Sequence, residues 1–66
     1  MKLFQLIHLL DPNMTICLQD DDFAIRYDSV DELIQDFIYY EEISTQEIRE
    51  IWYSKNLYGC LVITLK

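Results

Sequence analysis

The sequence predicts a single α+β domain over residues 1–66, with two layers and with helices packed on a mostly antiparallel sheet. Sixty-six residues are enough for one domain only. The chain is 52% hydrophobic and 14% aromatic, which is more apolar than a disordered acidic segment would be. Segments with helical spacing of apolar residues alternate with segments in which every second residue is apolar. The expected order is helix–hairpin–helix–hairpin.

The first half is expected to form a helix and a hairpin. Apolar residues at helical spacing predict a helix over residues 1–10, and Pro12 ends it because the residue before proline avoids the helical region. Residues 14–19 and 23–27 alternate as strands do. The polar run at residues 20–22 joins them as a turn.

The second half is expected to form a longer helix and a second hairpin. Ser29 and Glu32 have the spacing of a capping box, and the apolar stripe that follows predicts a helix over residues 30–41 with Phe37 central to the core. Residues 43–54 fit either a helix or a strand. Pairing of residues 48–54 with a strand at 60–65 is preferred, because the C-terminal strand needs a neighbour.

No group of residues in the sequence predicts catalysis, a cofactor or a metal. Gly59 is the only glycine, which excludes a phosphate-binding loop, and His8 has no evident partner. Cys17 and Cys60 are far apart and lack a histidine pair, so no zinc site is expected. No apolar run approaches the ~20 residues of a membrane span. The chain is therefore expected to be cytoplasmic and not an enzyme, with both cysteines reduced, buried and inert.

The charge predicts a protein partner and disfavours nucleic acid. Twelve acids against five bases give a net charge of −7, which repels phosphates and attracts basic surfaces. Two interpretations stay open: a charge that serves only solubility, and a nucleic-acid mimic that occupies a basic groove. Exposed tyrosines beside acids would suit such a binding face. The predicted partner-binding residues are Asp28, Asp31, Glu32, Asp36, Tyr39, Tyr40, Glu42 and Tyr53.

Three short runs carry a resemblance to known proteins: L-I-H-L-L-D-P at the start, D-S-V-D-E-L in the middle, and R-E-I followed by L-V-I-T-L at the end. They resemble small acidic proteins of phages and mobile elements of Gram-positive bacteria, a class that includes anti-CRISPR inhibitors. The resemblance implies a phage protein that inhibits a host nucleic-acid-handling protein, with a CRISPR RNA-guided nuclease as the target. It assigns no individual residue.

The alternative is a small structural or assembly protein of a phage or prophage that self-associates, for example as a homodimer. The contact would use the strand edge after Leu61 or the first helix. A small core gains stability from oligomerisation.

Overall fold

The computed structural model describes residues 1–39, 41–55 and 59–66. Its helices are α1 (Leu3–Ile7), α2 (Val30–Tyr39) and α3 (Glu41–Ser44). Its strands are β1 (Ile16–Gln19), β2 (Ala24–Tyr27), β3 (Ile48–Ser54) and β4 (Cys60–Leu65). The predicted α+β class is confirmed.

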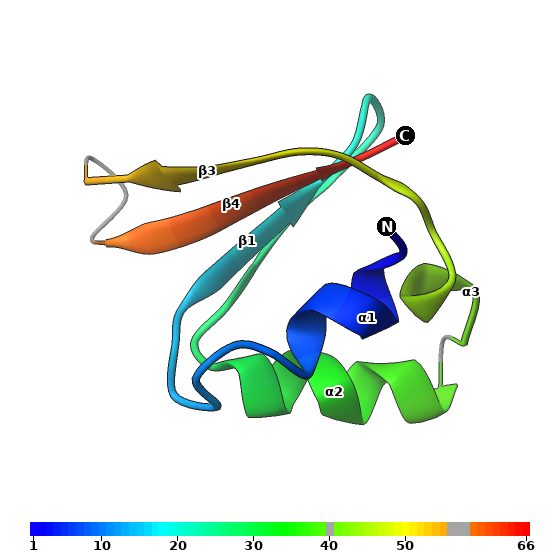
Figure 1. The fold of residues 1–66 in the computed structure, drawn as a ribbon, viewed down its shortest axis with the longest axis horizontal. Helices are drawn as coiled ribbons and strands as arrows, with labels where there is room; N and C mark the ends of the chain where they lie inside the picture. Colours follow the sequence, from blue (N-terminus) through cyan, green and yellow to red (C-terminus); the bar gives the residue numbers. More distant parts are fainter. Residues whose placement is uncertain (40, 56–58) are drawn as a thin grey trace.

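The four strands form one mixed sheet in the order β2-β1-β4-β3 (Figure 1). Both predicted hairpins form, since β1 pairs antiparallel with β2 and β3 pairs antiparallel with β4. The two hairpins join through a parallel pair, β1 with β4. The sequence prediction lacked this central parallel pair and the short helix α3, so the expected order and strand direction are only partly matched.

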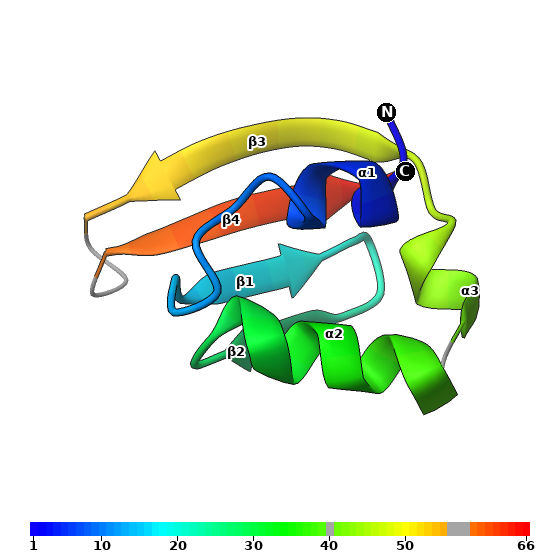
Figure 2. The same cartoon turned by 60° about the horizontal axis from the view of Figure 1, so that its bottom comes forward.

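All three helices of the described residues lie on one side of the sheet, which gives the predicted two layers (Figures 1 and 2). The core lies between the layers, and each member is at most 7% exposed. It comprises Leu3, Ile7, Ile16, Leu18, Tyr27, Val30, Leu33, Ile63 and Leu65.

Phe37 is half-buried and packs at the rim of the core, so the prediction that it is central is wrong. Helix α2 packs on β2 near its start and on α3 near its end (Figure 1). Its second half therefore leaves the sheet, and Leu33, one turn earlier, takes the fully buried position.

The predicted boundaries shift where the chain finds long-range partners. The first helix begins only at Leu3 because Lys2 forms an antiparallel bridge with Glu47, and it ends at Ile7, where residues 8–10 continue as turns. The ambiguous segment 43–54 contains both structures: α3 ends at Ser44, and β3 begins at Ile48. The Ser44 hydroxyl donates to the carbonyl of Glu41 at 2.7 Å, at the end of α3.

The start of α2 is held by its own polar residues. The Glu32 N–H donates to the Ser29 hydroxyl at 3.3 Å, as the capping-box spacing predicts. The Glu32 carboxylate accepts from the Asp28 N–H at 3.1 Å, one residue earlier than the usual box. Within the described ranges, no helix has the length and apolar character needed to cross a membrane.

Candidate functional site

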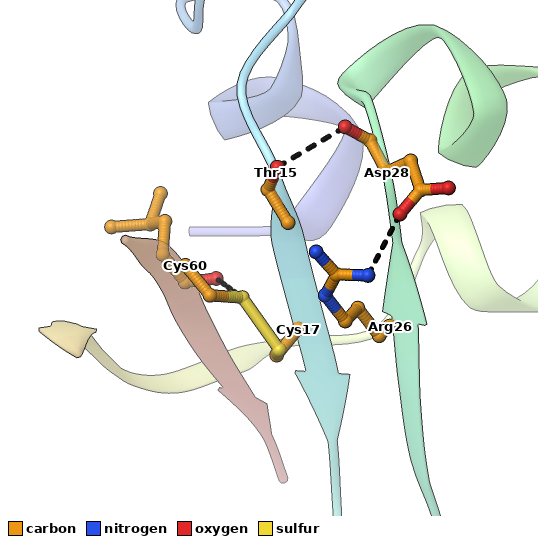
Figure 3. Close-up of a disulfide and its surroundings, with 6 residues drawn as sticks. Thr15, Cys17, Arg26, Asp28 and Cys60 are labelled. Carbon is orange, nitrogen blue, oxygen red and sulfur yellow. Dashed lines mark hydrogen bonds and ion pairs between the residues drawn. A yellow bond between two sulfur atoms is a disulfide. The ribbon is translucent and has the colours of Figure 1, made fainter. Parts of the chain in front are cut away.

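Three of the predicted binding acids at α2 stabilise the fold itself. The Asp28 carboxylate pairs with Arg26 at 2.8 Å, and the Asp28 carbonyl accepts from Thr15 (Figure 3). The Asp36 carboxylate accepts from the Tyr27 hydroxyl at 2.7 Å. Glu32 is bound in the helix cap, so the carboxylates of Asp28, Glu32 and Asp36 all have partners within the chain. They are therefore less available to bind another protein.

The remaining predicted residues do not lie on one surface. Tyr39 ends α2 and is 80% exposed, and Glu42 follows it in α3. Tyr53 stands near the end of β3, at the opposite end of the molecule (Figures 1 and 2). Tyr40 lies outside the described residues. The predicted acidic, tyrosine-rich face is therefore divided between two ends.

The structure gathers other acids that the sequence prediction did not group. The β1–β2 turn, α3 and the start of β3 lie at one end of the molecule, which we call the acidic end (Figures 1 and 2). An ion pair of 3.6 Å between Arg49 and Asp21 ties the turn to β3. The acids of the acidic end are Asp20, Asp21, Asp22, Glu41, Glu42, Glu47 and Glu50.

Most carboxylates left free by the fold belong to this acidic end. Asp20 accepts the N–H groups of Asp22 and Phe23, and Glu47 pairs with the N-terminal amino group. Asp22, Glu41, Glu42 and Glu50 make no side-chain hydrogen bond or ion pair to another described residue. A fifth acid whose carboxylate has no such partner in the described part of the chain is Asp31, on α2.

Comparison with known proteins finds no matching family model, no matching characterised protein and no matching solved structure. Function is therefore inferred from the chain's own side chains. Among the described residues, no group of three or more histidines, cysteines or acids could hold a metal ion.

Cys17 and Cys60 form a disulfide, so the prediction of two reduced thiols is wrong (Figure 3). The two residues are separated by 43 positions, but the parallel pairing of β1 with β4 brings their Cα atoms to 6.2 Å. That distance lies within the range a disulfide spans. No local pattern in the sequence indicates this parallel pair, so the proximity of the two cysteines was not predicted.

The face of the sheet opposite the helices carries a row of four side chains. Strand register aligns Arg26, Cys17, Val62 and Trp52 across β2, β1, β4 and β3. Val62 is almost fully buried although all the described helices lie on the other side. Trp52, in the same row, remains 44% exposed at the edge.

A shallow, open pocket of about 290 Å³ lies beside Tyr53 and Gly59, with Asp11 and Asn13 among its lining residues. Gly59 has a φ of +73°, and a Cβ atom there would lie 2.7 Å from the Tyr53 hydroxyl. His8 is exposed on the turn that follows α1. The cysteines are paired with each other, so neither supplies a thiolate nucleophile to His8 in this structure.

Proposed function

We propose that this chain is a non-enzymatic inhibitor from a phage or mobile element. It binds a nucleic-acid-handling protein in the host cytoplasm, and CRISPR RNA-guided nucleases are the proposed target class. The observation that carries the proposal is the set of free carboxylates at the acidic end. Carboxylates left without a cation create a negative field that attracts a surface built to bind phosphates.

The net charge of −7 supports a protein partner for this chain. Nucleic-acid binding rests on cations that neutralise phosphates, and two of the five basic side chains, Arg26 and Arg49, already pair with acids. Tyr39 adds an exposed aromatic ring at the same end as Glu42. Aromatic rings beside charges are frequent anchors in protein interfaces.

The first test is capture of the partner by the immobilised chain from a lysate of a Gram-positive host that carries a CRISPR nuclease. Captured nuclease should be released by added DNA, because the acidic end and the DNA would compete for one groove. Capture should also weaken as salt rises from 0.1 M, where the Debye length is ~10 Å, to 1 M, where it is ~3 Å. Recovery of no nucleic-acid-binding protein would refute the proposal.

The second test compares Glu42→Lys with Asp31→Lys in binding kinetics to the captured nuclease. Both acids are exposed, helical and free of side-chain partners among the described residues, and both substitutions change the charge equally. Glu42→Lys should slow association more than Asp31→Lys, since exposed interface charges act mainly on the association rate. Equal effects would show that only the net charge matters.

The alternative is a self-associating structural or assembly protein, and the strand order of the sheet reduces the surfaces through which it could self-associate. The strand edge after Leu61 is closed, because β4 lies between β1 and β3. Helix α1 retains exposed Phe4, and Leu9 is exposed just after it. Sedimentation velocity over a range of concentrations tests this alternative, which predicts dimers that dissociate in a Leu9→Lys variant.

A further inference from the structure

Strand β3 forms one edge of the sheet and is paired on one side by β4. It has seven residues, whereas β2, at the other edge, has four. An edge strand presents a row of backbone N–H and C=O groups to which another strand can pair. The register shift between Ile48 and Glu50 interrupts this edge near its start, and the regular stretch that follows, to Ser54, is still longer than β2 and is the better template for such pairing.

The N-terminal residues already pair with the beginning of this edge. Lys2 bridges Glu47 in antiparallel fashion, the Leu3 N–H donates to the Gln46 carbonyl at 3.0 Å, and the Ile48 N–H donates to the Met1 carbonyl at 2.9 Å. These contacts reach Ile48 and go no further along β3. The described residues place no strand against the outer side of β3 from position 49 to 54.

Large side chains stand on both faces of this uncovered stretch. The register places Ile51 and Tyr53 on the side of the helices and Trp52 on the opposite side. Their exposed fractions are 43%, 58% and 44%. A strand laid beside β3 would cover apolar surface on both faces, and Trp and Tyr are the residue types that most often dominate binding energy.

The net charge of the chain favours a basic occupant. Around the stretch itself the charges balance, because Arg49 is paired with Asp21, and exposed Lys55 follows β3 while Glu50 has no cationic partner among the described residues. A second copy of this chain would bring a further charge of −7 against the first. A basic segment would instead be attracted by this net negative charge, which favours its approach.

We infer that the outer edge of β3, from residue 49 to 54, accepts an extended basic segment of a partner protein as a fifth strand. The added strand runs antiparallel to β3, in the direction that Met1 and Lys2 already follow. Main-chain hydrogen bonds supply affinity in this mode, and alternate side chains supply specificity. The class of partner is taken from the proposed function, on which this inference rests. The new element is the place on the chain where that partner binds.

The probe is a synthetic peptide of about eight residues that alternates lysine with valine, the length of a common strand. Trp52 fluorescence and backbone amide NMR of the uniformly labelled chain follow the titration. The expected result is binding with shifts and hydrogen-exchange protection confined to β3. A peptide of the same sequence, N-methylated at alternate residues on one edge, should fail to bind because it lacks the donors.

Two matched variants separate strand addition from charge attraction. Ile51 and Ile25 lie at opposite ends of one cross-strand row, Ile25–Leu18–Ile63–Ile51, and are 43% and 42% exposed. Lysine at either position adds the same charge. Ile51→Lys should weaken peptide binding about tenfold or more, and Ile25→Lys by less than about threefold. Circular dichroism confirms that both variants are folded.

Three outcomes would overturn the inference. The first is equal binding of the N-methylated peptide, and the second is an equal loss in the two lysine variants. The third is a concentration-dependent dimer whose β3 amides are protected without peptide, which would make a second copy the occupant. If the peptide fails while DNA still competes for the captured nuclease, strand addition is wrong and the proposed function stands.

Discussion

Reduction of the Cys17–Cys60 disulfide should remove about half of the stability of this domain. The bond joins β1 to β4, the pair that connects the two hairpins. Its sequence separation of 43 sets the loop that the unfolded chain must keep closed. In the loop-entropy relation this separation corresponds to about 4 kcal/mol at 25 °C.

That magnitude is comparable to the ~3–5 kcal/mol that a core of this size supplies before a disulfide is counted. The reduced chain should therefore keep about half of the stability of the oxidised chain and stay mostly folded in the absence of denaturant. In a reducing cytoplasm the same loss would apply, and binding of the partner would offset part of it by mass action.

The assay is urea unfolding of the oxidised and reduced protein, followed by Trp52 fluorescence and by circular dichroism. A thiol count confirms the redox state of each sample. The control is a Cys17→Ser/Cys60→Ala variant, with alanine chosen at Cys60 because that side chain is fully buried. Reductant should not change its unfolding curve. Equal urea midpoints for oxidised and reduced wild type would refute the reasoning.

Three further sets of substitutions test the packing. Leu33→Ala should lower the free energy of unfolding by ~2–5 kcal/mol, and Phe37→Ala should lower it clearly less, because Leu33 is fully buried and Phe37 lies at the rim of the core. Thermal unfolding measures both losses, and a larger loss for Phe37→Ala would contradict the fold. Gly59→Ala should lower the free energy of unfolding by ~1–2 kcal/mol, because Gly59 has a left-handed φ. The loss should be smaller in a Tyr53→Phe background, where the new Cβ atom no longer meets the Tyr53 hydroxyl at 2.7 Å. An equal loss in both backgrounds would exclude that contact. Tyr27→Phe should lower the free energy of unfolding by ~1–2 kcal/mol, because it removes the hydrogen bond from Tyr27 to Asp36. Urea unfolding of Asp36→Ala, alone and combined with Tyr27→Phe, should show that the two losses are not additive. Additive losses would show that the two residues act independently.

The local elements follow from the sequence because local patterns determine them. The apolar stripe and the Ser29–Glu32 spacing placed α2 from Val30, and apolar alternation placed both hairpins. Composition determined the excess of acid, and the alternation of helix-spaced with strand-spaced segments predicted the α+β class. The signal for each local element lies within about a dozen neighbouring residues.

Only the tertiary structure decided how these elements meet. The parallel pairing of β1 with β4 joins residues more than forty positions apart, and no local pattern encodes it. That pairing produced the disulfide, closed the edge after Leu61 and left β3 as the long edge of the sheet. It also brought the β1–β2 turn, α3 and the start of β3 to one end, where the free carboxylates gather. Periodicity tells which face of a strand is buried, but the choice of neighbour depends on packing across the whole chain.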